Sequence, residues 1–264
     1  MKIGFIGCGN MAKAMLKGIV SSKLIKKEEI IAADISMSML EKVKEEMGIN
    51  ITNSNIEVAK GSQIIVLAVK PQYYSSVIKE IRDVINENTI VVSIAPGQTL
   101  EKLLKEFNKE VKIVRTMPNT PAMVLEGMTA ACKNEFVTDE EMEYVCSLLN
   151  SFGKSAVVQE YMMDAVVAVS GSSPAYVYMF IEALADGACR GGLPRDMAYK
   201  FAAQAVLGSA KMVLETGAHP GALKDMVCSP GGTTIEAVAA LESNGFRSAV
   251  IEAMKICEDK AKGM

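Results

Sequence analysis

The first 160 residues alternate between short apolar runs and longer stretches with apolar residues at helical spacing. Apolar runs of about four to eight residues bounded by turn residues are typical of buried strands, and apolar residues three or four apart are typical of helices. The predicted strands are Lys2–Ile6, Ile30–Ala33, Gln63–Val69, Thr89–Ala95 and Val111–Val114, and the predicted helices begin at Ala12, Ser36, Tyr73 and Thr138. Thr138 and Glu141 have capping-box spacing. Alternating strands and helices favour a parallel sheet with helices on both faces.

The pattern changes after about residue 160, where no further strand is predicted and Ala, Gly, Met, Leu and Val dominate. Several of the helices predicted there are apolar on nearly every side and must be buried on most sides. One domain of this size cannot bury them all, so we expect an α/β domain over 1–160 and an all-helical domain over 161–264 that associates with a second copy. The predicted helices are Asp164–Val169, Ala175–Arg190, Pro194–Glu215 with Pro194 in its first turn, Thr234–Ser243 and Arg247–Lys260.

A glycine-rich turn joins the first strand to the first helix. The sequence Gly7-Cys8-Gly9-Asn10-Met11-Ala12 fits G-x-G-x-x-A, in which Gly7 permits a tight turn and Gly9 lets a pyrophosphate approach the backbone. Free N–H groups at the helix start would bind the phosphates. A glycine-rich turn in some other α/β fold is the alternative, but the flanking strand and helix favour a Rossmann-type dinucleotide-binding domain over 1–160.

The second predicted strand ends in Asp34. A carboxylate at this position binds the adenosine ribose hydroxyls and repels a 2′-phosphate. Asp34 therefore predicts better use of NADH, although Ser36 and Ser38 are available to bind a phosphate.

Three more loops follow predicted strands, at 68–71, 93–97 and 116–121. Ligands of doubly wound sheets bind beyond the carboxyl ends of the strands. We expect the first two of these loops to flank the ribose and nicotinamide of a coenzyme. Alternatively, the prolines in these three loops serve only to form turns.

The helical half contains another candidate site between His219 and Thr234. The segment 229–234 supplies hydroxyl groups and a glycine backbone directly before a predicted helix, whose free N–H groups suit a carboxylate. A capped loop between helices explains the same residues equally well. His219 is the only histidine and precedes a proline in a turn, so we expect it to be structural.

Composition excludes several classes of function. The net charge of −3 gives no indication of a nucleic-acid partner, and the longest uncharged stretch, Ala165–Ile181, is too short and too interrupted to span a membrane. The six cysteines lie far apart, and with a single histidine they form no metal-ligand cluster. We predict reduced thiols in a cytoplasmic protein that takes a small-molecule substrate, with no metal, nucleic acid or membrane partner.

The absence of one catalytic motif reduces the number of reactions that fit the sequence. No tyrosine has a lysine four residues later, so the acid pair of short-chain dehydrogenases is missing. Carbonyl reduction needs a proton donor for the forming alkoxide. A protonated imine is already electrophilic and needs only positioning, a carboxylate anchor and a hydroxyl for its nitrogen, which the segment 229–234 can supply.

Five motifs spread over the whole chain resemble pyrroline-5-carboxylate reductases. They are Phe5–Met11, Ala68–Pro71, Met117–Pro121, Ser170–Tyr176 and Leu223–Thr234. The resemblance implies NAD(P)H-dependent reduction of 1-pyrroline-5-carboxylate to L-proline, the last step of proline biosynthesis. It also implies a homodimer formed by the C-terminal helices, with the capacity to assemble further.

The same resemblance implies residue roles. Substrate contacts are implied at Ser229, Gly231, Gly232 and Thr234, with Thr234 hydrogen-bonding the ring nitrogen as the catalytic residue. Coenzyme contacts, to NADP or NAD, are implied at Ile6, Gly7, Cys8, Gly9, Asn10, Met11, Asp34, Asn55, Ala68, Val69, Lys70, Pro71, Ile94 and Ala95.

Two departures and two alternatives accompany the resemblance. Relatives that prefer NADPH are expected to have a small polar residue where Asp34 stands, and many relatives are expected to have alanine in place of Pro96. A β-hydroxyacid dehydrogenase would need a catalytic lysine on a C-terminal helix; Lys200 and Lys211 are available, but neither lies in a motif like that family's. The other alternative is a non-catalytic dinucleotide-sensing protein.

Overall fold

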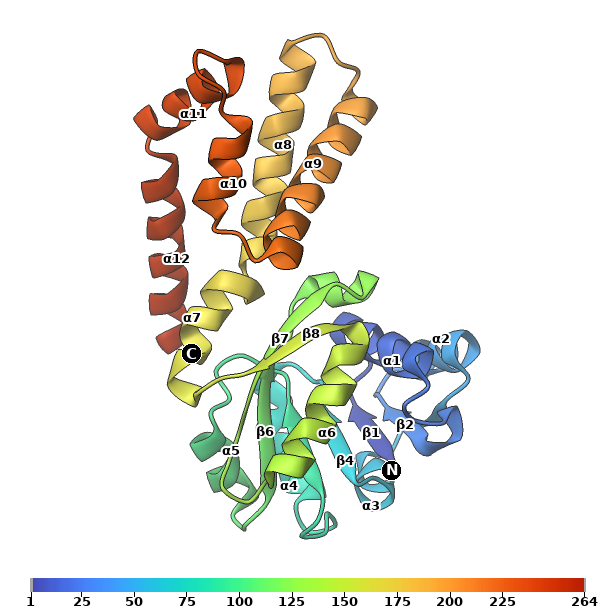
Figure 1. Cartoon of the computed structure of the whole chain (residues 1–264). Coiled ribbons are helices and arrows are strands. Elements are labelled where there is room, and N and C mark those ends of the chain that lie inside the picture. The colour runs from blue at the N-terminus through green and yellow to red at the C-terminus, as the bar shows by residue number, and fades with distance from the viewer. Residues whose placement is uncertain (1, 264) are drawn as a thin grey trace. The chain divides into compact units, whose positions relative to one another are not determined.

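The computed structural model describes residues 2–263 and divides into two compact units (Figure 1). The first unit runs to Ser172 and also includes the chain from Cys257 onward, and the second is Ser173–Ile256. We call them the sheet unit and the helical unit.

The sheet unit is built on one eight-stranded sheet with the order β3-β2-β1-β4-β5-β6-β7-β8. The order of its first six strands is that of a Rossmann fold, which confirms the predicted doubly wound architecture. The described strands pair parallel, as expected, except for β6 and β7, which pair antiparallel. The strands are β1 (Ile3–Ile6), β2 (Ile30–Ala33), β3 (Asn50–Thr52), β4 (Ile64–Leu67), β5 (Ile90–Ser93), β6 (Lys112–Met117), β7 (Gly127–Lys133) and β8 (Gly153–Val157).

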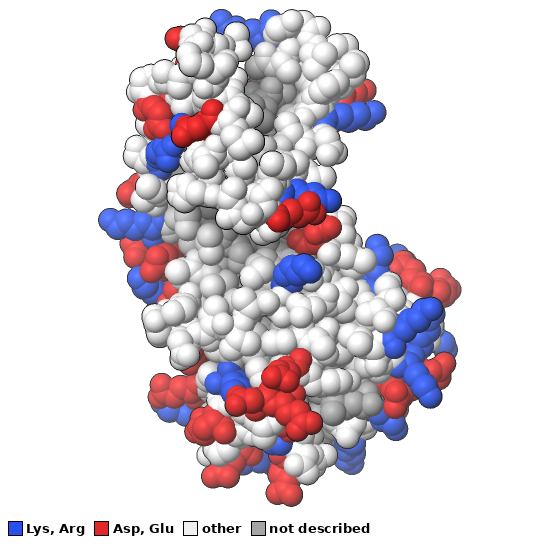
Figure 2. Space-filling model, viewed as in Figure 1, with Lys and Arg blue, Asp and Glu red and all other residues white. Residues whose placement is uncertain are grey.

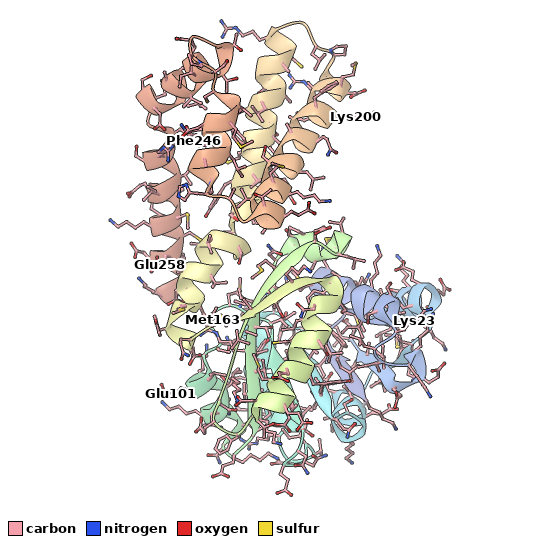
Figure 3. All side chains as sticks on the ribbon, viewed as in Figure 1. Lys23, Glu101, Met163, Lys200, Phe246 and Glu258 are labelled. Atoms are coloured by element: carbon pink, nitrogen blue, oxygen red, sulfur yellow. The ribbon has the colours of Figure 1, made fainter. Side chains whose placement is uncertain are left out.

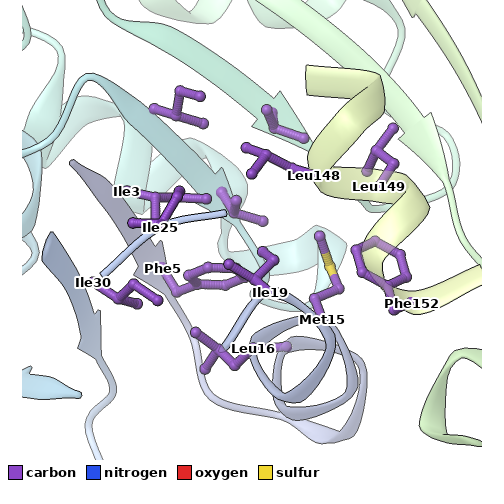
Figure 4. Packing of buried hydrophobic residues seen from close by; sticks show 14 of the residues in the cluster. Ile3, Phe5, Met15, Leu16, Ile19, Ile25, Ile30, Leu148, Leu149 and Phe152 are labelled. Carbon is purple, nitrogen blue, oxygen red and sulfur yellow. The ribbon is translucent and has the colours of Figure 1, made fainter. Parts of the chain in front are cut away.

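Alternate residues of β1, β2, β4, β5 and β6 contribute to two separate cores, one on each face of the sheet. The face of the sheet that includes Phe5 packs against α1 (Asn10–Ser22), α2 (Met37–Met47) and α6 (Asp139–Leu149). Figure 4 shows this packing for Met15 and Leu16 of α1 and for Leu148 and Leu149 of α6. The opposite face packs against α3 (Asn55–Gly61), α4 (Tyr74–Ile81) and α5 (Leu100–Phe107). Six short 3-10 or π segments complete the unit: Lys27–Glu29, Pro71–Tyr73, Thr120–Val124, Asn150–Phe152, Glu160–Met162 and the π-helical turn Val167–Gly171.

Five elements of the sheet unit have no counterpart in the sequence prediction: β3, β7, β8, α3 and α5. The strands among them lack a continuous run of large apolar residues. β7 is largely buried but contains small residues such as Ala130 and Ala131, and β3 and β8 are edge strands that contain half-exposed residues. The predicted capping box at Thr138 is present, with hydrogen bonds in both directions between Thr138 and Glu141.

The segment from Glu160 to Ser172 packs on the sheet unit, and all of it after Glu160 was predicted to belong to the helical domain. Glu160 Oε1 accepts hydrogen bonds from Arg115 Nη1 at 3.0 Å and from Leu100 N at 2.8 Å. Met163 of α7 (Met163–Val166) is buried against Ala130 and Cys132 of β7. These contacts explain why the compact units divide after Ser172.

The helical unit contains α8 (Ser173–Arg190), α9 (Arg195–Thr216), α10 (Pro220–Val227), α11 (Thr233–Ser243) and most of α12 (Phe246–Lys262). Pro194 is the N-cap of α9 and not a residue of its first turn, and α10 was not predicted. The side chains buried in α8 and α9 are alanines only, Ala185, Ala198 and Ala202. The face of this unit seen in Figure 2 is largely uncharged.

Large apolar side chains of the helical unit are exposed in a single chain. Phe246 of α12, which is labelled in Figure 3, contacts Phe180 of α8 with 5.9 Å between the ring centroids and 44° between the ring planes. Phe201 is 64% exposed, Leu214 84% and Ile251 67%. None of the described helices is long and apolar enough to cross a membrane.

Candidate active site

A cavity of about 460 Å³ opens at the carboxyl ends of β1, β2 and β4. This is the edge at which doubly wound sheets bind their ligands. The lining residues are Ile6, Gly7, Gly9, Ala33, Asp34, Ile35, Asn55, Ala68, Val69, Lys70, Tyr73, Ser76, Val77 and Glu80.

The glycine turn forms one wall of the cavity and has the geometry that a pyrophosphate requires. Gly7 has φ +100°, and a Cβ atom there would lie 2.7 Å from the Ala68 carbonyl oxygen. Gly9 is the N-cap of α1, and a Cβ atom there would enter open space. The first N–H groups of a helix have no partners within it. An anionic group can therefore approach the backbone of Gly9 and the start of α1.

The Asp34 carboxylate is fixed by two backbone N–H groups. Oδ2 accepts from Cys8 N at 2.8 Å and Oδ1 accepts from Ser36 N at 2.9 Å. Ser36 Oγ lies 3.1 Å from Ser38 Oγ, within hydrogen-bonding distance. Burial raises the pKa of the Cys8 thiol to about 12, and the nearby Asp34 carboxylate adds to the rise. Cys8 therefore packs as a neutral thiol, and its backbone rather than its sulfur serves the site.

Eight of the fourteen predicted coenzyme residues line the cavity: Ile6, Gly7, Gly9, Asp34, Asn55, Ala68, Val69 and Lys70. The other six do not line it. Cys8 is buried under the turn, Asn10 and Met11 begin α1, Pro71 begins a 3-10 turn, and Ile94 and Ala95 follow β5.

Sequence reasoning missed the wall that α4 contributes. Tyr73, Ser76, Val77 and Glu80 line the cavity from one side of this helix, at spacings of three and four residues. That spacing directly after Lys70-Pro71 was a usable signal. Asn55 Nδ2 donates to Glu80 Oε2 at 2.8 Å, so a second carboxylate stands in the cavity with Asp34.

The loop before α11 in the helical unit is shaped by its two glycines. Gly231 has φ +66°, and a Cβ atom on Gly232 would lie 2.4 Å from Ser229 Oγ. Gly232 is the N-cap of α11 and its N–H donates to Ser229 O at 3.0 Å. Ser229, Pro230 and Gly231 are exposed and Thr234 is half-buried. The loop thus presents a hydroxyl and a glycine backbone at the start of an eleven-residue helix.

His219 has the structural role expected of it, because it is the N-cap of α10 and its Nδ1 accepts from Gly221 N at 3.0 Å. Asn119, in another of the predicted strand-end loops, is also tied into the fold. Its Nδ2 donates to Ser170 O at 3.0 Å and its Oδ1 accepts from Met128 N at 2.9 Å. All six cysteines are free thiols.

Two family models match the chain. Residues 160–264 match pyrroline-5-carboxylate reductase dimerisation, and residues 2–97 match NADP oxidoreductase, coenzyme F420-dependent. The pyrroline-5-carboxylate reductase of Escherichia coli is 54% identical over 99% of this chain and 97% of its own length.

Solved structures agree with these matches. A pyrroline-5-carboxylate reductase from Coxiella burnetii is 35% identical with a TM-score of 0.94, covering 99% of this chain and 97% of that one. The Plasmodium falciparum enzyme, solved with NADP bound, is 36% identical with a TM-score of 0.89, covering 100% and 97%. The chain therefore belongs to the pyrroline-5-carboxylate reductase family of NAD(P)-dependent oxidoreductases.

Proposed function

We propose that this protein reduces 1-pyrroline-5-carboxylate to L-proline with NADH or NADPH. The observation that carries the proposal is the pair of loops, a glycine turn at a Rossmann strand end and a glycine–hydroxyl loop at a helix start, in a member of this family. No specific observation favours either alternative, the β-hydroxyacid dehydrogenase or the non-catalytic dinucleotide-sensing protein.

The cavity residues fit a dinucleotide. The N–H groups at Gly9, Asn10 and Met11 would hold the pyrophosphate, and Asp34 the adenosine ribose. The loops after β4 and β5, through Val69, Lys70, Pro71, Ile94 and Ala95, would border the ribose and the nicotinamide. The bound coenzyme supplies the hydride.

The loop before α11 would hold the substrate. The N–H groups around Gly231 and Gly232 suit the substrate carboxylate, because they lie on an exposed glycine backbone at a helix start. The Thr234 hydroxyl would hydrogen-bond the imine nitrogen, and Ser229 shapes the loop through its contact with Gly232. No residue has to abstract a proton from carbon, because the protonated imine accepts hydride directly.

Replacement of Thr234 by valine tests this assignment. Thr234→Val keeps the shape and leaves a polar substrate atom without its partner, which costs about 1–3 kcal/mol. We expect kcat/KM for the imine to fall roughly 5- to 200-fold, with coenzyme affinity nearly unchanged. The measurements are steady-state proline formation and a coenzyme-binding titration.

Thr216→Val is the matched control, because it makes the same change on an exposed threonine at the end of α9, outside the loop. Near-normal turnover of Thr234→Val would move the catalytic role elsewhere. A wild-type protein that forms no proline from the cyclic imine with either coenzyme would remove the proposed function itself.

We further infer that the coenzyme cavity favours NADH. Asp34 is fixed by Cys8 N and Ser36 N, and Glu80 places a second carboxylate in the same cavity. A 2′-phosphate brought near these groups meets like charge, which outweighs the availability of the Ser36 and Ser38 hydroxyls.

The ratio of kcat/KM for NADPH to that for NADH measures this preference. Asp34→Ser should raise the ratio by roughly 10-fold or more, since removal of one like-charge contact is worth at least about 1.4 kcal/mol. Asp34→Asn removes the charge but keeps an acceptor oxygen, and should move the ratio in the same direction. If neither variant moves it, Asp34 does not select the coenzyme.

The functional division, assembly and location follow from the same features. We infer a dinucleotide-binding part over 1–160 and a substrate-binding part over 161–264 that forms a homodimer through its helices and can assemble further. Exposed apolar side chains such as Phe201 and Leu214 support the inference that these helices carry the dimer surface. Six free thiols support the cytoplasm as its location.

A further inference from the structure

The buried side chain of Tyr74 joins the ends of two strands below the coenzyme cavity. Tyr74 begins α4 and is 1% exposed. Its hydroxyl donates to the Leu67 carbonyl oxygen at 2.7 Å and accepts from Ser93 Oγ at 3.2 Å. Leu67 and Ser93 are the last residues of β4 and β5 and face each other in the parallel ladder. One oxygen atom therefore links the two strands at the point where their loops begin.

The backbone of Ile94 and of Ala95, in the loop that follows β5, lies close enough to Tyr74 to lower its pKa, and Thr116 Oγ1 donates to Ser93 O at 2.9 Å. Burial raises the pKa of Tyr74 to about 12, although the hydrogen bonds from Ser93 and the backbone lower it. The hydroxyl therefore stays protonated at physiological pH and donates permanently to Leu67.

The loop after β4 is held from its other side by the glycine turn. Gly7 approaches Ala68 so closely that a Cβ atom would lie 2.7 Å from the Ala68 carbonyl oxygen. Ala68, Val69 and Lys70 line the cavity, whereas Tyr74 points to the core below them. The backbone of this loop is thus confined between a glycine turn and a buried phenol.

We propose that Tyr74 is a positioning residue that sets the spacing of the loops 68–71 and 94–95, and thereby the placement of the nicotinamide end of the coenzyme. The inference rests on the proposed function, in which these loops border the nicotinamide. Tyr74 lies in the core and acts only through Leu67, Ser93 and the backbone of the loop after β5. Hydride transfer depends on near-attack geometry, so a small loop displacement reduces the rate of the chemical step more than coenzyme affinity.

Tyr74→Phe keeps the ring and removes the hydroxyl. We expect kcat to fall about 5- to 50-fold and the primary isotope effect with deuterated reduced coenzyme to rise, because hydride transfer becomes rate-limiting. KM for the coenzyme should change by less than about 3-fold, since the adenosine end is held by the glycine turn and Asp34. Ile78→Val is the matched control, a core substitution on the same helix and in the same cluster. It should lower Tm and leave kcat and the isotope effect unchanged.

A double variant tests the shared oxygen. Ser93 donates to Tyr74, so Ser93→Ala should lower kcat in the wild-type background and add little to Tyr74→Phe. Additive losses, or a Tyr74→Phe variant with normal kcat and isotope effect whose Tm falls as in Ile78→Val, would assign Tyr74 a purely structural role.

A binding measurement separates this inference from the proposed function. Fluorescence of the reduced coenzyme on binding, measured without imine, reports the surroundings of the nicotinamide whatever substrate is reduced. We expect a changed emission for Tyr74→Phe and none for Ile78→Val. Unchanged emission would contradict the positioning role even if the wild type reduced a different substrate.

Discussion

The sheet unit and the helical unit differ in what they bury. Phe5, Tyr74, Phe107 and Phe152 are each 1% exposed or less in the sheet unit, where two helical layers cover both faces of the sheet. In α8 and α9 the buried side chains are alanines, while large apolar residues such as Phe201 face outward. The first unit buries its largest aromatic side chains within one chain, and the second, which matches a dimerisation domain, leaves large aromatic side chains exposed on its helices.

This difference in burial matches two requirements of the proposed reaction. The coenzyme loops need strand ends that are held in place, and the buried core of the sheet unit holds them. The helical unit combines the proposed substrate loop with a surface that needs a second copy, since contiguous apolar patches of this kind mark interaction sites. We therefore expect folding and association of the helical unit to be coupled, so its apparent stability should depend on protein concentration.

Charge placed on the helical surface should have the largest effect. Leu207 and Leu214 lie seven residues apart on α9, which places them on one side of the helix, and are 55% and 84% exposed. Leu207→Glu with Leu214→Glu would bury unpaired charge on association, at a cost of several kcal/mol. We expect loss of the dimer at micromolar concentration in sedimentation experiments.

Leu24→Glu is the control, because Leu24 is similarly exposed but belongs to the sheet unit. It should sediment as the wild type does. A folded wild-type monomer at micromolar concentration would contradict the coupling of folding and association, because the exposed helical surface would then need no partner.

Truncation of one phenylalanine in each unit sharpens the comparison. Phe107 is 1% exposed, so Phe107→Ala should lower the free energy of unfolding by about 3–5 kcal/mol through lost burial and a cavity. Phe201→Ala should cost clearly more than the ~0.5 kcal/mol typical of an exposed site, because we expect a second chain to cover the residue. Denaturant titration at two protein concentrations measures both. A negligible cost at Phe201 would place that residue outside the interface.

The smallest expected effect concerns the salt bridge between Lys112 and Glu141. Burial alone would raise the pKa of Glu141, but hydrogen bonds to Lys112 and Thr138 outweigh it and lower the pKa. A lowered pKa in the folded state contributes stability above the unfolded pKa, and this stability is lost as pH falls through the folded value. Glu141→Gln keeps the cap and removes the charge, so it should cost about 0.5–1 kcal/mol at pH 7.

The free energy of unfolding of Glu141→Gln and of wild type, measured by denaturant titration at several pH values, tests this explanation. The difference between Glu141→Gln and wild type should vanish in acid, once both side chains are neutral. A difference that stays constant from pH 7 to pH 3 would mean that packing, and not charge, explains it.

The parts of the fold that could be predicted are those in which local pattern and final environment agree. β1 runs directly into the glycine turn and Asp34 directly follows β2, and the structure has these elements where the sequence predicted them. β7 could not be predicted, because its small side chains are buried by residues from elsewhere in the chain, such as Met163 of α7. Glu80 was missed although its helical spacing after Lys70-Pro71 was a usable signal, and only the packing of α4 beside the strand ends shows that it lines the cavity. The hydroxyl contacts of Tyr74 join residues of α4, β4 and β5 and leave no trace in periodicity.

The return of α12 to the sheet unit has a consequence for the order of folding. Cys257 Sγ donates to Ser172 Oγ at 3.2 Å, across a sequence separation of 85 residues, and the chain from Cys257 onward belongs to the sheet unit. During synthesis the strands emerge long before this segment, and closing so long a loop is entropically slow. We expect the nascent sheet unit to form with its site for the end of α12 still open. Completion of the sheet unit then follows synthesis of the helices that carry the dimer surface.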